Sequence, residues 1–444
     1  MMPFSELVGR TVAASVLLAL CLGATPAPQA LPYQVVGDVT ESFALLTSTY
    51  YDTVDPQTLL AAAANALADA AHKHGVTIAP PALKVEGDRD ATISELDGAI
   101  TSAANSAHAS PSDFAYAAIV GMAKATNDRY TQFFTPAEFK AFNDALDPER
   151  IGGIGVIIEP DPTSGCVRVT YVLPSTPAER AGMAAGDVIT AVDGKPTKGQ
   201  SVESVSGRLR GKAGTTVAVT ISRTTAPSVL SITREDVQPP TVVFKMLPNG
   251  IGYIWVMEFG KATPNEFDTA VSRLNGLGAK ALILDLRNDG GGYVNSALDI
   301  SSRFIANKAL LTVEERGKRA TTIDADGDPS INLPVTVLVN QYTASASEIT
   351  AGALQDDGIG TLVGAKTFGK GVMQTLTRLP DGAAIKITTA HYLTPSQRDI
   401  NLRGIDPDVR VDENTDARFG DVANDAQLRA AIALLQKKIA SDKT

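Results

Sequence analysis

Histidine and cysteine are scarce in this chain of 444 residues, which has four histidines and two cysteines. No H-E-x-x-H or C-x-x-C pattern occurs, so the sequence offers no recognisable zinc site. The scarcity of histidine and cysteine also argues against catalysis by a Cys–His or Ser–His pair. We therefore expect no metal or other cofactor, and a general base other than histidine if the protein is an enzyme.

Basic residues are also in the minority, and the net charge of −10 argues against nucleic acid as a partner. The serine-hydrolase pattern G-x-S-x-G and the pattern S-x-x-K are both missing. With 44% hydrophobic and 20% charged residues, the composition is that of an ordinary globular protein. At about 150 residues per domain, the length predicts about three domains.

The longest apolar run near the start covers residues 12–22 and is too short to span a membrane. It follows Arg10 and precedes small residues, which is typical of a secretory signal peptide. We interpret residues 1–30 as this signal and expect an exported, periplasmic or extracytoplasmic protein. Cys21 resembles a lipoprotein cysteine poorly, because a bulky leucine precedes it closely. An uncleaved leader would keep the protein at the membrane, and the mature chain is expected to have no stable membrane span.

In the remaining chain, the composition and the predicted secondary structure change from one region to the next. Residues 31–150 are rich in alanine with helical patterns, such as the Asp55-Pro56 start of a helix. Residues 151–236 are short apolar strands between glycine and proline turns. After the linker at Pro239-Pro240, strands alternate with helices over residues 237–413, and residues 414–444 hold an amphipathic helix with Asp425 as a candidate cap. The pattern predicts an α/β multidomain protein.

Two strand-to-helix junctions in the third region have the same design. One strand runs into Gly290, Gly291 and Gly292, where backbone N–H groups are open to a ligand at a helix start. The other runs into Ser345, which lies at the start of the next helix. Together they could form an oxyanion hole beside a serine nucleophile. The alternative is structural, because Ser345 and Glu348 also have the spacing of a capping box.

A third element surrounds Lys370. It nearly matches a phosphate-binding loop, but Gly371 stands where a hydroxyl is required and a strand, not a helix, follows. A lysine between Gly369 and Gly371 could instead be held against backbone as a neutral base. Burial must then lower its pKa from about 10.4, because few such lysines are neutral near pH 7 otherwise.

These motifs resemble those of the carboxyl-terminal processing peptidases. The similarity rests on residues 286–291, 345–349 and 367–374, with support from residues 128–134, 390–395 and 404–408. It implies a crotonase-like ββα protease core and a Ser–Lys dyad of Ser345 and Lys370. By the same resemblance Gln374 orients the lysine, and the oxyanion donors are the amides of Ala346 and of either Gly290 or Gly291.

The middle region resembles a PDZ domain inserted into this core. Residues 152–156 resemble its carboxylate-binding loop, and residues 182–189 match a second signature. The resemblance implies that Gly153, Ile154, Gly155 and Val156 bind the C-terminal tail of a protein, which adds as a strand. A homodimer through the N-terminal helical segment is a further family-based expectation.

The sequence thus predicts a tail-specific serine endopeptidase that acts on exported proteins. The main alternative is a non-catalytic PDZ scaffold or ligand-binding protein on the same fold. A crotonase-like acyl-CoA enzyme, using the two oxyanion amides without a dyad, is a third. The only histidine in the catalytic half, His391, is interpreted as structural, because no triad motif accompanies it.

Overall fold

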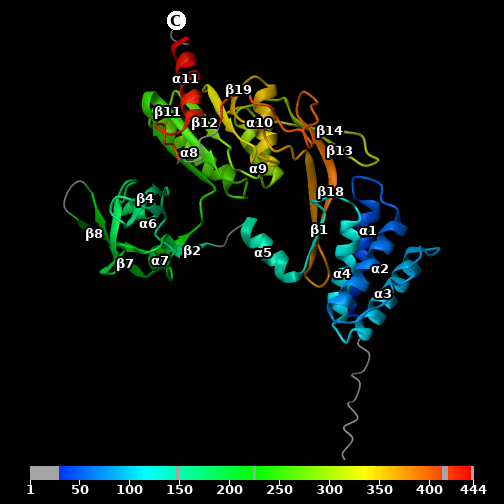
Figure 1. Ribbon diagram of the computed structural model, residues 1–444. Helices are drawn as coiled ribbons and strands as arrows, with labels where there is room; N and C mark the ends of the chain where they lie inside the picture. The colour runs from blue at the N-terminus through cyan, green and yellow to red at the C-terminus, as the bar shows by residue number, and fades with distance from the viewer. Residues whose placement is uncertain (1–29, 147–149, 224–226, 413–418, 442–444) are drawn as a thin grey trace, which may run out of the picture.

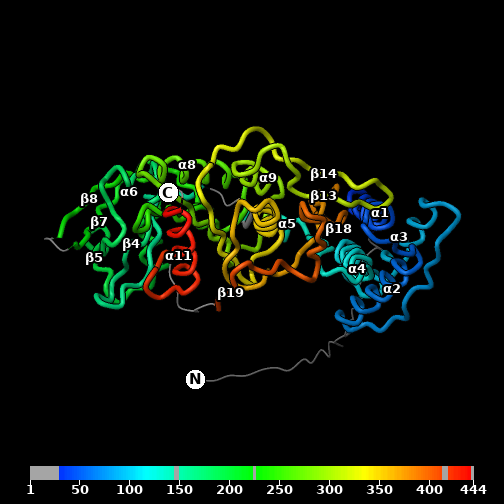
Figure 2. The backbone as a smooth tube through the Cα atoms, turned by 90° about the horizontal axis from the view of Figure 1, so that it is seen from above, coloured from blue at the N-terminus to red at the C-terminus, as the bar shows by residue number. Residues whose placement is uncertain are grey.

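The computed structural model describes residues 30–146, 150–223, 227–412 and 419–441. The predicted signal peptide lies outside these residues except for residue 30. The described part forms three bodies in a row, with the helical N-terminal body at one end and the small β body at the other (Figures 1 and 2). A larger α/β body lies between them, so each end of the molecule contacts the central body.

Four helices make up the N-terminal body. They are α1 (Tyr33–Ser48), α2 (Pro56–Lys73), α3 (Arg89–Ser106) and α4 (Pro111–Lys124). Asp55 caps α2 as predicted, accepting a hydrogen bond from the Gln57 N–H at 3.3 Å. Helix α3 was not expected as a separate element, since its many small and polar residues give a weak apolar pattern. It is capped by Asp88, the residue before it, whose side chain accepts from the Ala91 N–H at 2.7 Å.

The helical body packs on a long β-hairpin that belongs to the central body. Strands β17 (Val372–Arg378) and β18 (Ala384–Leu393) form it around the predicted turn at residues 379–382. Strand β1 (Gln132–Phe134), followed by α5 (Pro136–Leu146), pairs with one end of β18, and β13 (Ala309–Glu315) with the other. Strand β14 (Thr321–Asp324) completes this sheet. The tip of the hairpin is buried in the helical core through Leu379, Ala383, Ile385 and Ile387.

The small β body has one main sheet and two short helices. Its sheet contains β3 (Val156–Pro160), β4 (Val167–Val172), β5 (Val188–Val192), β7 (Thr216–Ser222) and β8 (Ser228–Thr233), with β6 (Lys195–Pro196) beside β5. Helices α6 (Pro177–Arg180) and α7 (Val202–Leu209) lie against it, and β2 (Ile151–Gly153) pairs with β9 (Glu235–Val237). The predicted strand at residues 154–158 is interrupted at Gly155, where φ is +85°.

The central body is built on a second sheet. Its strand order is β10 (Val242–Leu247), β11 (Ile251–Val256), β12 (Ala281–Asp285), β15 (Val335–Val339), β16 (Gly360–Gly364) and β19 (Val409–Arg410), and every pair except β10–β11 is parallel. The short 3-10 turn η1 (Pro248–Gly250) connects the first two strands.

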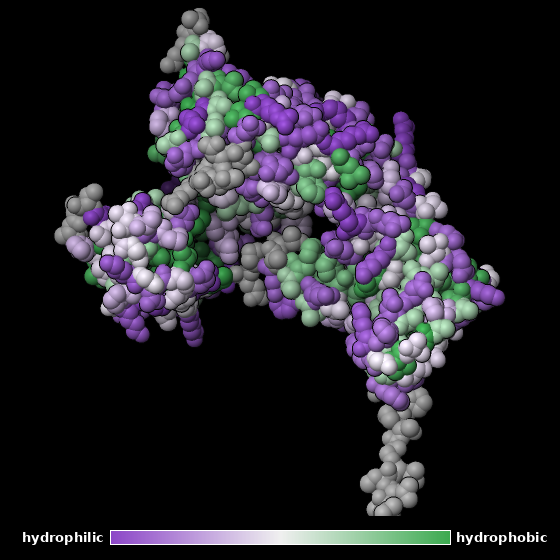
Figure 3. Space-filling view, in the orientation of Figure 1, coloured by the Kyte–Doolittle hydropathy of each residue, from purple (hydrophilic) through white to green (hydrophobic). Residues whose placement is uncertain are grey.

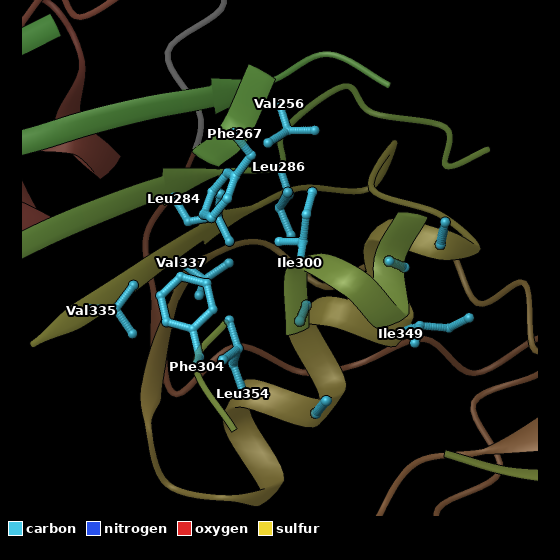
Figure 4. Close-up of a cluster of buried hydrophobic side chains, with 14 of the residues drawn as sticks. Val256, Phe267, Leu284, Leu286, Ile300, Phe304, Val335, Val337, Ile349 and Leu354 are labelled. Atoms are coloured by element: carbon cyan, nitrogen blue, oxygen red, sulfur yellow. The ribbon is translucent and has the colours of Figure 1, made fainter. Parts of the chain in front are cut away.

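Helices cover both faces of this sheet. Successive side chains of β12 point to opposite faces, and the buried residues of this strand therefore pack against helices on both sides. Leu282 and Leu284 pack in one core with α8 (Thr263–Gly276), α9 (Val294–Ser302) and α10 (Ala346–Asp356). Figure 4 shows Leu284 in this cluster. Ala281 and Ile283 face α11 (Ala426–Ser441) on the other side. Within the described residues, no helix is long and apolar enough to cross a membrane.

Candidate active site

The two predicted junctions lie side by side at the carboxyl ends of β12 and β15. These strands are parallel neighbours, so the loops that follow them meet at the same edge of the sheet. The Ala344 N–H donates to the Asp289 carbonyl at 3.0 Å, and the Asn288 N–H donates to Asn340 Oδ1 at 3.0 Å. The structure therefore brings the triple-glycine loop and the Ser345 loop into direct contact.

Ser345 stands at a sharp turn between the loop after β15 and helix α10. Its backbone has φ 59° and ψ −117°, a region that residues with a side chain rarely adopt. An ordinary helix cap has extended backbone, and this conformation costs about 1–3 kcal/mol. Gly291 packs on the turn so closely that a Cβ there would lie 2.8 Å from the Ser345 Cβ. Strain at a nearly buried serine favours a functional role over simple capping.

Lys370 lies in the loop between β16 and β17, and both flanking glycines press against residues 400–404. A Cβ on Gly369 would lie 2.6 Å from the Gly404 nitrogen, and one on Gly371 would lie 2.7 Å from the Asn401 nitrogen. The two glycines thus allow the backbone on either side of the lysine to pack closely against residues 400–404. Burial is the main cause that lowers the pKa of Lys370, which falls to about 8.

The backbones of Ser345 and Lys370 are held by the same two side chains. Glu348 Oε2 accepts from the Ser345 N–H at 2.9 Å and from the Lys370 N–H at 2.8 Å. The Tyr392 hydroxyl lies 2.6 Å from the Lys370 carbonyl oxygen and 3.2 Å from that of Ser345. Complete burial raises the pKa of Tyr392, so its hydroxyl stays protonated and can donate. The backbones of both residues are thus held in a fixed relative position by Glu348 and Tyr392, which we call the shared frame.

The side chains of the predicted dyad are not joined in this structure. Among the described residues, Ser345 Oγ and Lys370 Nζ share no hydrogen bond, and Lys370 Nζ lies 4.9 Å from the centre of the Tyr130 ring. Gln374 was expected to orient the lysine. Within the same residues it forms no hydrogen bond with Lys370; its Nε2 donates to Thr388 Oγ1 at 3.4 Å.

The candidate oxyanion donors differ in what they already bind. The Gly291 N–H donates to Asp289 Oδ1 at 2.8 Å. The N–H groups of Gly290 and Ala346 form no hydrogen bond with any described residue, and Gly290 is exposed. Burial raises the pKa of Asp289 to about 8. Of the two glycines that the sequence left open, Gly290 thus has its N–H available.

The chain also resembles known proteins over most of its length. The model of peptidase family S41 matches residues 250–411, and a PDZ domain model matches residues 168–223. A carboxyl-terminal-processing protease of Picosynechococcus is 37% identical over 330 residues, which is 73% of this chain and 79% of that protein. The chain belongs to peptidase family S41. Its match to a CtpA-like serine protease of Staphylococcus saprophyticus is 34% identical and covers 67% of the chain and 60% of that protein. The solved photosystem II D1 C-terminal processing protease has 28% identity, a TM-score of 0.46, and coverage of 86% and 94%.

The chain is therefore a serine-type peptidase of family S41 with a PDZ domain. In its PDZ domain, the four residues expected to bind peptide line one groove. The same groove is also lined by Ser206, Leu209 and Arg210, at the end of α7, and by residues 237–240. In the space-filling view, the molecule is hollowed between the PDZ domain and the helical body, below the peptidase core (Figure 3).

Several residues around the site of this S41 peptidase were not singled out from the sequence. Asp128 and Tyr130 approach Lys370 from the N-terminal segment, and only their inclusion in a family-like motif pointed to them. Tyr392 was likewise part of a motif without a role. Within the described part of the chain, no group of three or more His, Cys, Asp or Glu residues could hold a metal ion. His391 stacks on the ring of Tyr51, with 4.0 Å between the ring centres.

Proposed function

We propose that this S41 peptidase is an endopeptidase that captures the C-terminal tails of exported proteins with its PDZ domain and cleaves them with a Ser345–Lys370 dyad. The observation that carries the proposal is the shared frame of Glu348 and Tyr392. It fixes a strained serine and a lysine of lowered pKa beside two free backbone N–H groups. A binding protein would need none of these features.

In this mechanism, neutral Lys370 accepts the proton of Ser345 Oγ as that oxygen attacks the scissile carbonyl. The N–H groups of Gly290 and Ala346 stabilise the negative charge that develops on the carbonyl oxygen. The lysine then donates its proton to the leaving amine, and water hydrolyses the acyl-enzyme. Lys370 has to move from the Tyr130 ring to reach Ser345 Oγ, and catalytic hydrogen bonds often tighten only when substrate binds.

Tail recognition is assigned to Gly153, Ile154, Gly155 and Val156. Successive backbone amides at such a loop can bind a terminal carboxylate, while the substrate adds as a strand. Arg210 lines the same groove and supplies a positive charge that suits an anionic terminus. In this proposal the anionic end of a tail binds at the loop, and the side chains that precede it contact apolar lining residues such as Leu209.

The predicted crotonase-like topology, the domain limits 1–30, 31–150, 151–236, 237–413 and 414–444, and a homodimer through the helical segment belong to the same proposal. Export is tested by sequencing the mature N-terminus. A start near residue 31 supports the assignment of a cleaved signal, and retention of residues 1–30 in the exported protein contradicts it.

The central experiment compares wild type, Ser345→Ala, Lys370→Ala and Lys370→Arg on a protein with an apolar C-terminal tail. We expect cleavage by wild type only. An arginine stays protonated, so an active Lys370→Arg enzyme would rule out a lysine base. Wild-type cleavage that persists in Ser345→Ala would overturn the nucleophile. If the wild type binds the tail but cleaves no substrate, the alternative of a PDZ scaffold is favoured.

A further inference from the structure

The loop between α4 and β1 comes from the N-terminal body and reaches the active site of the peptidase core. Tyr130 lies with its ring 4.9 Å from Lys370 Nζ. Arg129 packs over the ring of Phe368, two residues before that lysine, and its Nη2 donates to the Tyr130 hydroxyl at 2.6 Å. A segment outside the matched peptidase region therefore contacts the side chain on which the proposed chemistry depends.

The Asp128 side chain holds this loop in place through hydrogen bonds within the turn and to β18. Its Oδ1 accepts from the Tyr130 N–H at 2.9 Å, and its Oδ2 accepts from the Thr131 hydroxyl at 2.8 Å and the Thr388 hydroxyl at 2.5 Å. Thr388 Oγ1 also accepts from Gln374 Nε2 at 3.4 Å. A chain of polar contacts thus runs from Gln374 on β17 through Thr388 on β18 to Asp128.

The charges around Lys370 come from three elements. Lys386 on β18 and Arg129 oppose protonation of Lys370, whereas Asp128 and Glu348 on α10 favour it. Asp128 acts in the same direction on Lys386, so this one carboxylate is a counter-charge for both lysines. Lys386 is held by its own contacts, with its Nζ 5.4 Å and 5.3 Å from the ring centres of Phe134 and Phe142.

From these contacts we infer that the turn at residues 128–131 is a positioning element of the active site. In it, Tyr130 holds the Lys370 side chain, and the Asp128 carboxylate offsets the positive charge of Lys386 beside that lysine. The inference rests on the proposed function of Lys370 as the base. It makes the N-terminal helical body part of the catalytic apparatus, because α4 and β1 fix both ends of this turn. Asp128 and Tyr130 act through Lys370 and need not contact the substrate.

The test uses two substitutions that move the pKa of Lys370 in opposite directions. Asp128→Asn removes a charge that favours the ammonium form, so the acid limb of kcat/KM moves to lower pH. Lys386→Met removes a repulsive charge while keeping an apolar stem, so the limb moves to higher pH. We expect each shift to be about half a pH unit or more. A general loosening of the site would not produce shifts of opposite sign.

Asp69→Asn is the matched control, because Asp69 is exposed on α2 and has no part in these contacts. The same pKa is measured directly by NMR of the lysine side chains in Ser345→Ala protein carrying each substitution. That readout needs no substrate, so it tests the inference even where cleavage fails. Unchanged Lys370 titration in both Asp128→Asn and Lys386→Met would overturn the inference, whereas inactivity of the wild type alone would count only against the proposed function.

The chain of polar contacts from Gln374 through Thr388 to Asp128 is tested separately at Thr388. Thr388→Val removes the hydroxyl between Gln374 and Asp128, and we expect kcat to fall about tenfold with little change in KM. Thr388→Ser restores the hydroxyl and should restore kcat. At Tyr130 the phenylalanine variant keeps the ring and should stay active, whereas Tyr130→Leu should lose kcat. Equal activity of the valine and serine variants at Thr388, together with an active Tyr130→Leu, would contradict a positioning role.

Discussion

Ser345 and Lys370 donate their backbone N–H groups to one oxygen atom, Oε2 of Glu348. The other carboxylate oxygen accepts from the Thr367 hydroxyl at 2.6 Å and from the Gly369 N–H at 2.8 Å. One buried carboxylate thus receives four donors from two separate loops. The relative position of the predicted nucleophile and base depends on this residue, which the sequence presents only as half of a capping box.

Glu348→Gln should therefore cost more than a capping residue normally does. In glutamine an NH2 group replaces one carboxylate oxygen, and two of the four donors that now bind Glu348 would then face another donor. We expect the free energy of unfolding to fall by about 2–4 kcal/mol. Activity should fall at least about a hundredfold, since a small displacement of the base is enough to do so. Urea unfolding and kcat measurements on the same preparation test both effects.

Glu138→Gln is the matched control for this prediction. Glu138 forms a capping box with Thr135 at the start of α5, with hydrogen bonds of 2.9 and 3.3 Å, but it is exposed and its bonds are local. Its substitution should cost less than about 1 kcal/mol. Equal losses at the two positions would show that Glu348 is only a cap.

The strained backbone of Ser345 predicts an unusual order of stabilities. Glycine adopts φ near +60° without a Cβ penalty, so Ser345→Gly should be more stable than Ser345→Ala by about 1 kcal/mol, although we expect both to be inactive. Ser347 is the control, because it lies within helix α10, where glycine costs about 1 kcal/mol relative to alanine. The sign of the glycine–alanine difference should reverse between the two positions. Thermal unfolding of the four variants measures it, and the same sign at both would exclude strain at Ser345.

Asp289 predicts a dependence of stability on pH. Burial raises its pKa from 3.8 to about 8, with Glu258 adding to the effect, so the folded protein holds a proton that the unfolded chain releases. This contribution to stability is complete below about pH 4 and is lost as the pH rises toward 8. Asp289→Asn cannot ionise and keeps an acceptor for the Gly291 N–H. It should therefore gain stability relative to wild type as the pH rises, at about 1.4 kcal/mol per pH unit at most.

Urea unfolding of wild type and Asp289→Asn at pH 5, 6.5 and 8 measures this difference. Groups common to both proteins cancel in it, and Asp69→Asn shows how far removal of an exposed carboxylate alone changes the curve. A difference that stays constant with pH would mean that Asp289 is ionised throughout, like an ordinary surface carboxylate.

The sequence could predict the parts of the site that follow from local pattern. Ser345 and the triple glycine each lie in the loop that follows a buried strand, and parallel neighbouring strands bring such loops together. The pairing of Asp128 with Thr388 joins residues 260 positions apart, and no periodicity or turn pattern carries that information. The hydrogen bond of Gln374 with Thr388 could not be predicted for the same reason. Its partner hydroxyl lies on β18, and the register between β17 and β18 shifts just before Gln374, which sequence alone does not specify.

The C-terminal helix shows the same limit and gives the last prediction. Asp425 was expected to cap α11, and it does so by accepting from the Leu428 N–H at 2.9 Å. The structure adds a buried ion pair, in which Arg287 Nη2 lies 2.7 Å from Asp425 and 2.6 Å from Asp285. Arg287 lies three residues before Gly290, so its guanidinium group connects α11 to the loop that holds the three glycines.

Asp425→Ala should destabilise the protein by about 3–5 kcal/mol, because it leaves Arg287 with part of its buried charge unpaired as well as removing a cap. The helix itself remains in place through Leu428 and Leu435, so kcat should fall through movement of the glycine loop and not through unfolding at room temperature. Asp421, in the same connecting segment, accepts from the nearby N–H groups of Ala423 and Asn424 and has Lys245 as a more distant counter-charge. Asp421→Ala should therefore cost less than about 1 kcal/mol. If the two variants unfold at the same urea concentration, the ion pair contributes no net stability, and α11 is held to the sheet by its apolar face alone.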